Sequence, residues 1–293
     1  MRPDRRRTGL WRAGAQALLF SLSSFSAASA FDSVPRRIAS LNLTADEILV
    51  EILPLDRLVA ATAAADDAGT SNVAGRLPPG VARFRRAEME RLLALSPDLV
   101  VVSEYTDPDF LRLVERSGMR VHRMRGLDSL AGFRAAILEL GRAVGEEQGA
   151  VRLVERYDAV LAELSRRLAG VAKPRVLYWA GGMTAGRGTA IGALIEAAGA
   201  VNVGHELGVE GIAPIGAERA FVADPDTVLV GEGWKTTEAL RAHPLLSRLR
   251  AVQQGRIVAM PTELLVTLSH HAAEACWYLS WALHPDRVPR PRP

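Results

Sequence analysis

An internal repeat constrains the fold of this 293-residue chain more than any other feature. Residues Glu90–Val102 read ERLLALSPDLVVV, and Glu218–Val230 read ERAFVADPDTVLV, 128 positions later. Each copy predicts a short helix opened by the glutamate, a Pro-Asp turn and a buried strand. A chain that uses this block twice is predicted to form two lobes of like construction.

The two glutamates then lie at equivalent points of the two lobes. A carboxylate in the first turn of a helix is favoured by the helix dipole, which explains either glutamate alone. As a matched pair, Glu90 and Glu218 predict two surface acids that clamp a basic partner with two-fold symmetry.

Around both copies, short β-rich runs alternate with amphipathic helical stretches, which indicates an α/β fold with mostly parallel sheets. In the first half we expect strands at Ile38–Leu41, Leu58–Ala61, Leu99–Val102 and Val121–Met124, and helices at Ala45–Leu53, Arg86–Leu95 and Ser129–Val144. In the second half we expect strands at Val176–Trp179, Thr227–Val230 and Ile257–Ala259.

One long helix is predicted between the halves, over Glu146–Leu168. Its apolar residues recur at helical spacing, its other faces are charged, and Lys173-Pro174 closes it. The alternative is an ordinary surface helix of a single domain, but its place midway along the chain favours a rigid spacer. We therefore predict Rossmann-like lobes at 31–144 and 173–293, joined by a linking helix at 145–172.

The N-terminus has the layout of an export signal. Five arginines precede an uncharged stretch of small and apolar residues, Ala13–Ala28, and Ala28-Ser29-Ala30 suits signal peptidase. Residues 1–30 are therefore predicted to be cleaved, leaving Phe31 first. A membrane anchor is disfavoured because the stretch is short, and the arginine pair leaves both the general and the twin-arginine export routes open.

Without this segment, 31 basic and 32 acidic residues remain, so the basic balance gives no support to nucleic-acid binding. Cys276 is the only cysteine, which excludes an intrachain disulfide, and no cysteine stands at the cleavage point to carry a lipid. We expect a monomer, free in the periplasm and without a cofactor.

The sequence resembles the class III periplasmic binding proteins of ABC importers, which deliver ferric siderophores, haem and vitamin B12. The resemblance covers nearly the whole chain after residue 30. The segments that carry it are Arg37–Glu47, both glutamate blocks, Thr184–Thr189, Ala197–Asn202 and Arg256–Pro261. It implies two lobes joined by one helix, a ligand in the cleft between them, no catalysis, and a permease dimer whose arginines pair with Glu90 and Glu218.

Ligand contacts are expected from loops at the strand ends, with aromatic side chains for stacking and basic ones for anionic groups. The candidates are Asn42, Arg76, Arg83, Phe84, Arg85, Tyr105, Trp179, Met183, Thr184, Arg187, Trp234 and Glu263. A core aromatic or a solvated arginine is the alternative for each.

The ligand itself is less constrained. The basic group Arg76, Arg83, Arg85 and Arg86 suits an anionic ferric siderophore, which we rank first. Cobalamin or cobinamide is second, since few aromatic residues stand where a corrin ring needs them. Haem is third, because Arg83 and Phe84 occupy the neighbourhood where related haem receptors carry a tyrosine.

Three further alternatives were weighed. Bare metal binding is disfavoured because His270 and His271, the only adjacent histidines, point about 100° apart on a helix. An enzyme is disfavoured because the glycine-rich segment Gly181–Gly188 fits neither G-x-G-x-x-G nor a P-loop. A receptor that signals through the same two glutamates, rather than one that imports, stays open.

Overall fold

The first half of the chain forms a five-stranded parallel sheet in the computed structural model, which describes residues 33–233 and 235–291. The strands are β1 (Ile38–Ser40), β2 (Leu58–Thr62), β3 (Ala82–Phe84), β4 (Leu99–Ser103) and β5 (Arg120–Met124), in the order β3-β2-β1-β4-β5. The predicted signal segment and Trp234 lie outside the described residues.

Helices cover both faces of this sheet. They are α1 (Leu43–Ile52), α2 (Met89–Leu95), α3 (Pro108–Arg116) and α4 (Leu130–Val144). Asn42, Asp107 and Ser129 begin α1, α3 and α4 by accepting backbone N–H bonds, and Gly145 ends α4 in the left-handed region at φ 72°. Leu99 and Val101 face one core and Val100 and Val102 the other, which explains the unbroken apolar run.

The second half repeats this plan with a four-stranded parallel sheet, in the order β11-β10-β6-β8. Its strands are β6 (Arg175–Tyr178), β8 (Val201–Asn202), β10 (Thr227–Gly231) and β11 (Ile257–Met260). An antiparallel pair, β7 (Met183–Ala185) and β9 (Ile212–Pro214), lies beside it. The helices are α6 (Ala190–Ala197), α7 (Val203–Glu206), α8 (Ala217–Ala223), α9 (Thr236–Ala242), α10 (Arg250–Gln253), α11 (Thr262–Leu265) and α12 (Ala272–Leu283).

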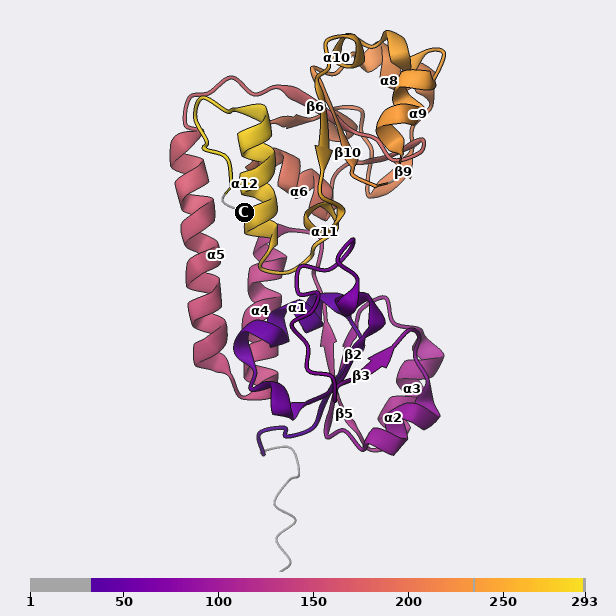
Figure 1. The fold of residues 1–293 in the computed structure, drawn as a ribbon, viewed down its shortest axis with the longest axis vertical. Coiled ribbons are helices and arrows are strands. Elements are labelled where there is room, and N and C mark those ends of the chain that lie inside the picture. The colour runs from indigo at the N-terminus through magenta and orange to yellow at the C-terminus, as the bar shows by residue number, and fades with distance from the viewer. Residues whose placement is uncertain (1–32, 234, 292–293) are drawn as a thin grey trace, which may run out of the picture. The chain divides into compact units, whose positions relative to one another are not determined.

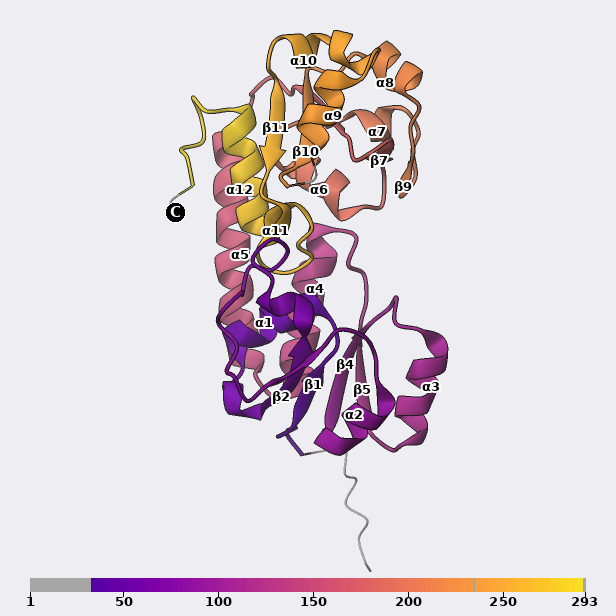
Figure 2. The same ribbon diagram turned by 45° about the vertical axis from the view of Figure 1, so that its right-hand side comes forward.

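The 21-residue helix α5 (Glu147–Arg167) connects the two halves and packs alongside α4 and α12 (Figures 1 and 2). Its buried residues Leu153, Val154 and Tyr157 join the core of the first half, whereas Leu164 joins that of the second. A Cβ on Gly141 of α4 would lie 2.3 Å from that of Ala150, so only glycine allows this approach. The architecture is the predicted one: two α/β lobes and one long helix between them.

Buried hydrogen bonds also join the two halves. The Glu47 side chain, 2% exposed, accepts bonds from Asn72 N and Nδ2 at 3.1 and 2.8 Å. From the α11–α12 connection it accepts Thr267 Oγ1 at 3.0 Å and Ser269 Oγ at 2.5 Å. Four donors satisfy this buried carboxylate, so α1 is tied to the second half by a polar joint.

Some local features differ from the sequence-based expectations. The helix expected from Arg86 begins at Met89, because Ala82–Phe84 is a strand and Glu88 is extended. Helix α3 and the β7–β9 pair were not predicted. Within the described residues, no helix has the length and apolarity to span a bilayer.

Candidate functional site

The repeated blocks form two short helices with the same ending. Glu90 and Glu218 are each the second residue of their helix, α2 and α8, and both side chains are exposed. Each helix ends in a non-glycine residue in the left-handed region, Ser96 at φ 44° and Asp224 at φ 41°, and proline follows. Such backbone is strained and persists only where surrounding contacts hold it.

An arginine supplies those contacts in both halves. Arg37, just before β1, donates to the carbonyls of Leu95 and Ser96, with its shortest bond, Nη2 to Leu95 O, at 2.6 Å. Arg175, which opens β6, donates through Nη1 to the carbonyls of Ala223 and Asp224 at 2.8 and 3.1 Å. We call these two residues the clamp arginines.

The aspartate after each proline adds further hydrogen bonds to the same strand. Asp98 accepts bonds from the backbone N–H groups of Arg36 and Arg37, and Asp226 accepts the N–H of Arg175 at 2.9 Å. Each of the two helices that carry these glutamates, α2 and α8, which we call the Glu helices, is thereby fixed to the first strand of its own sheet. An exposed apolar residue accompanies each glutamate: Leu93 at 49% and Val222 at 83% exposure.

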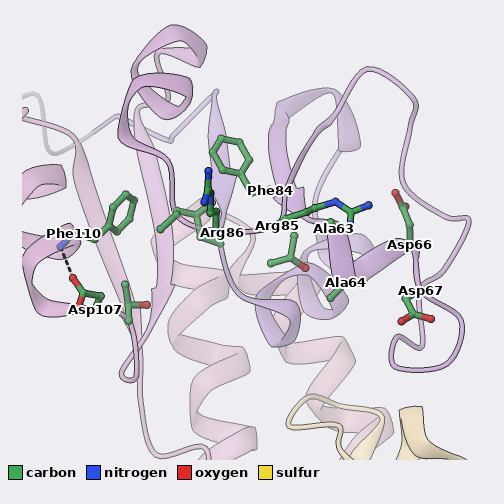
Figure 3. Close-up of a pocket in the computed structure, with 13 residues that line it drawn as sticks. Ala63, Ala64, Asp66, Asp67, Phe84, Arg85, Arg86, Asp107 and Phe110 are labelled. Atoms are coloured by element: carbon green, nitrogen blue, oxygen red, sulfur yellow. Dashed lines mark hydrogen bonds between the residues drawn. The ribbon is translucent and has the colours of Figure 1, made fainter. Parts of the chain in front are cut away.

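A cavity of about 780 Å³ opens at the carboxyl ends of the first-half strands. After β1 the chain passes to β2 on one side, whereas β4 lies on the other side of β1, so the loops diverge and leave a crevice. Leu41, Thr62, Ala63, Phe84 and Thr106 are among its lining residues. Figure 3 shows Asp107 and Phe110 on one side, Asp66 and Asp67 on the other, and Arg85 and Arg86 between them.

Most charged groups of this crevice are already bonded. Asp66 accepts Arg83 Nε at 2.6 Å, Asp67 accepts the N–H of Gly69, and Asp107 caps α3. Arg86 donates to Glu88 at 3.0 Å. Arg85 is the lining cation that has no hydrogen bond or ion pair within the described chain, so it remains available to an anionic group.

A buried carboxyl lies behind the crevice wall. Asp46 of α1 is 0% exposed, and its Oδ2 accepts the N–H and hydroxyl of Thr62 at 3.0 and 2.5 Å. Burial, aided by the charge of Glu47, raises the pKa of Asp46 to about 7 against the opposing hydrogen bonds from Ser40 and Thr62. Its Oδ1 has no hydrogen-bond partner among the described residues.

Four of the predicted ligand residues lie at or next to this crevice. Phe84 and Arg85 line it, and Phe84 is 3% exposed with the Arg91 guanidinium 4.6 Å from its ring centroid. Asn42 follows the lining residue Leu41, but its side chain caps α1 and contacts Met124 Sδ. Tyr105 precedes Thr106 and is 75% exposed.

The other candidates in the first half are held elsewhere. Arg83 is bound to Asp66 and to loop carbonyls, so it supports the wall rather than presenting a free charge. Arg76 pairs with Glu51 in a separate cavity. The expected basic group of four arginines is therefore divided, and two of its members reach the crevice.

In the second half, the candidates mostly support the fold. Trp179 is 7% exposed within a hydrophobic core, and Thr184 is fully buried with its hydroxyl bonded to Tyr178 O. Met183 pairs with Pro214 between β7 and β9, and Arg187 lies 3.6 Å from Glu210 on the surface. Glu263 is half-buried, and its carbonyl accepts Asn72 Nδ2.

Sequence reasoning missed Thr62, Asp66, Asp107 and Phe110 as individual lining residues. Thr62 ends β2, Asp66 ends the 3-10 helix that follows β2, Asp107 caps α3, and Phe110 lies in the first turn of α3. Asp66 and Asp107 lie in strand-end loops, from which ligand contacts were expected, whereas the unpredicted α3 concealed Phe110.

A family model described as "Periplasmic binding protein" matches residues 38–264, which is most of the chain. The chain belongs to this periplasmic binding protein family. Its members are solute-binding proteins rather than enzymes, lie in the periplasm or otherwise outside the cytoplasm, and work with ABC transporter permeases.

Among solved structures, this periplasmic binding protein is similar to a periplasmic heme-binding protein from Pseudomonas aeruginosa, with a TM-score of 0.75 and 26% identity over 88% of this chain and 96% of that one. It is also similar to the periplasmic heme-binding protein RhuT from Roseiflexus sp. RS-1, in apo form, with a TM-score of 0.73 and 25% identity over 85% and 98%.

A curated relative is a cobalamin-binding protein from Halobacterium salinarum. It is 29% identical over 254 residues, which cover 79% of this chain and 64% of the relative. The chain thus spans less than two thirds of the length of the curated relatives that it matches.

Proposed function

We propose that this protein is the receptor of an ABC importer and that its cargo is a corrinoid of the cobalamin type. The cavity at the ends of β1, β2, β3 and β4 holds the ligand against Phe84 and Phe110. The observation that carries the proposal is Arg85, a lining cation without a partner in the described part of the chain. Cobalamin carries one phosphodiester anion on a large body of neutral amides, and one free guanidinium complements it.

The named relatives support this cargo in part. The relative from Halobacterium is named for cobalamin, whereas two of the similar structures are named for haem. A haem receptor needs a side chain that ligates iron, and the described residues that line this crevice include no His, Tyr, Cys or Met. A corrinoid brings its own axial ligands, so it requires shape, stacking and hydrogen bonds only.

A ferric siderophore is the second candidate, because Arg85 and the exposed Arg86 also suit a chelate with several negative charges. The two cargoes differ in how much charge they need. Arg86 shares its charge with Glu88, and three aspartates line the same cavity, so the lining as a whole does not favour a multiply charged anion.

Delivery follows from the two glutamates. We propose that Glu90 and Glu218 each pair with an arginine of a permease dimer, while residues 31–144 and 173–293 act as lobes on either side of the linking helix at 145–172. Export through a cleaved signal at residues 1–30 would bring the receptor to the periplasm. We propose that it acts there as a monomer. The clamp arginines support this role, because they fix both exposed acids relative to their sheets.

Calorimetric titration of the chain from Phe31 onward tests the cargo. Cyanocobalamin, dicyanocobinamide, ferric siderophores and haem are titrated separately. We expect saturable binding of cyanocobalamin and dicyanocobinamide. Because cobinamide lacks the phosphodiester, Arg85→Ala should weaken cyanocobalamin about tenfold and leave dicyanocobinamide nearly unchanged.

Arg86→Ala is the matched control, since this neighbour lines the same cavity but is already paired with Glu88. It should alter both affinities about twofold or less. Saturable binding of a ferric siderophore without corrinoid binding would replace the first cargo with the second. Binding of none of the four would contradict the proposal.

A further inference from the structure

In the first half, one hydrophobic core joins the wall of the crevice to a Glu helix. Phe84 and Phe110 line the crevice (Figure 3), and both rings belong to a buried cluster that also contains Leu92 of α2, which is 0% exposed. Helix α2 also contacts α3, which carries Phe110 (Figure 2). Because protein cores are packed about as densely as organic crystals, a displacement of either ring is felt at Leu92.

Arg91 adds a polar contact between the same two parts. It follows Glu90 directly on α2, and its Nη1 donates to Arg83 O at 2.7 Å. Its guanidinium carbon lies 4.6 Å from the centroid of the Phe84 ring, which is a cation–π contact. Arg83 and Phe84 belong to β3, a three-residue strand that pairs with β2 at the edge of the sheet. One side chain therefore holds both the backbone and the ring of a strand that forms the crevice wall.

The second half has the same arginine with a different partner. Arg219 follows Glu218 on α8, and its Nη2 donates to Leu207 O. The side chain that α8 buries is that of Ala220, whereas α2 buries the much larger Leu92. The described residues that line the crevice all belong to the first half. Cargo in the crevice thus contacts the core that holds α2 but not the core that holds α8.

The Glu helix of the first half depends on these contacts. It has seven residues, and a helix of that length is not stable by itself in water. When α2 opens, β3 loses its bond to Arg91 and Phe84 loses the packing of Leu92. Cargo binds the intact wall, so it favours the closed state of α2 by mass action. In return, a partner that holds α2 closed strengthens the binding of cargo.

We propose that Arg91 is a positioning residue that couples cargo in the crevice to Glu90, the docking acid of the first half. This inference rests on the proposed function, since it takes the crevice as the cargo site and Glu90 as a permease contact. Cargo fixes β3, and Arg91 and Leu92 carry this constraint to α2, so Glu90 is held more firmly when cargo is bound. Glu218 is presented alike with and without cargo. The permease therefore recognises a loaded receptor through the first half.

Hydrogen–deuterium exchange of the chain from Phe31 onward, with and without saturating cyanocobalamin, tests the coupling on the receptor alone. The amides of residues 92–95 report on α2, because none of these residues lines the crevice. The amides of residues 220–223, at the same positions of the repeat, report on α8. Cyanocobalamin should slow exchange in α2 about threefold or more and change exchange in α8 by less than about 1.5-fold.

Variants of the two arginines separate coupling from stability. Arg91→Gln removes the cation over Phe84, so the slowing of exchange in α2 should fall below about 1.5-fold, and the affinity for cyanocobalamin should fall by a corresponding factor. Arg91→Lys keeps a cation and should retain part of the slowing. Arg219→Gln is the matched control in the second Glu helix and should leave the response of α2 unchanged. A loss of stability alone would speed exchange equally with and without cargo, and the ratio would not move.

Calorimetry on the same samples distinguishes a failure of the cargo from a failure of the coupling. Equal slowing in α2 and α8, or undiminished slowing in Arg91→Gln, would overturn the coupling while cyanocobalamin still binds. If cyanocobalamin does not bind, the proposed cargo is wrong, and the same exchange pattern is expected with whichever of dicyanocobinamide, a ferric siderophore or haem does bind. Binding of none of them would overturn both proposals. If Arg91→Gln does not fold, Arg91→Met serves the same comparison, because it keeps a long side chain without the charge.

Discussion

The two halves of this molecule agree in their framework and differ at their strand ends. Each has a clamp arginine at its first strand, a helix with an exposed glutamate, and a left-handed residue before Pro-Asp. After β1, however, the chain enters α1 directly and buries Asp46 and Glu47, whereas after β6 it forms the β7–β9 pair and buries Thr184.

This difference separates the requirements of docking from those of ligand binding. A partner with two-fold symmetry must contact both halves in the same way, so the parts that hold Glu90 and Glu218 are repeated. A single asymmetric ligand imposes no such condition, and the 780 Å³ cavity is built from the loops of the first half, where Arg85 has no partner among the described residues. The following predictions test this separation.

Charge reversal of both glutamates should have the largest effect. In Glu90→Lys with Glu218→Lys, both proposed contacts with permease arginines become repulsive, so uptake should fall at least about a hundredfold. Each single reversal should cause a similar partial loss if the halves are equivalent. Uptake of labelled cyanocobalamin by cells that express each variant measures this.

Ligand affinity of the purified double variant should stay within about twofold of the original protein, because neither glutamate lines the crevice. Asp109→Lys on α3, an exposed acid outside the two Glu helices, is the control for added charge. Uptake that survives the double reversal would favour the receptor that signals without importing.

The polar joint that unites the halves should dominate stability. Glu47→Ala removes a buried carboxylate that accepts four hydrogen bonds from Asn72, Thr267 and Ser269, at a cost of about 3 kcal/mol. Urea denaturation measures the free energy of unfolding. Glu115→Ala, on the exposed face of α3, should change it by less than about 0.5 kcal/mol, and an equal loss in both variants would refute the importance of the joint.

The repeated framework could be predicted from the sequence. For the crevice, the sequence predicted its position at the strand ends but not which side chains line it. The glutamate blocks, the parallel sheets and the long helix follow from periodicity and from the match between Glu90–Val102 and Glu218–Val230. No local pattern shows that Arg37 and Arg175, far from these blocks in sequence, bond to their helix ends. Nor does sequence show that Arg83 pairs with Asp66 while Arg85 has no partner in the described part of the chain, since that depends on which side chains meet across loops.

The clamp arginines should differ in strength between the halves. Arg175 also binds Glu206 Oε2, through Nε and Nη2 at 3.0 and 2.8 Å, whereas the partners of the Arg37 side chain within the described residues are backbone carbonyls. Arg175→Ala should cost about 2 kcal/mol and Arg37→Ala about 1 kcal/mol. Both should reduce uptake at saturating ligand about tenfold, because the strained helix ends lose their support.

Arg57→Ala is the matched control for the clamps. Arg57 likewise donates to backbone carbonyls, those of Pro35 and Val144, and pairs with Glu146, but it does not touch either Glu helix. It should lower stability without lowering uptake at a temperature where the protein is folded. An equal loss of uptake in Arg57→Ala would mean that the clamps act only through stability.

The smallest expected effect is a pH dependence confined to the first half. Asp46 has a pKa of about 7 in the folded protein, against about 4 when unfolded, so between these values the folded state binds one more proton. Stability should therefore fall as pH rises from about 4 to 7, with a slope of at most about 1.4 kcal/mol per pH unit from this group. Asp46→Asn keeps the acceptor for Thr62 and should remove that slope, making the variant the more stable of the two at pH 8. Parallel stability profiles for the two proteins across this range, from urea denaturation at each pH, would show that Asp46 is ionised when folded and that the carboxyl behind the crevice does not distinguish the first half from the second.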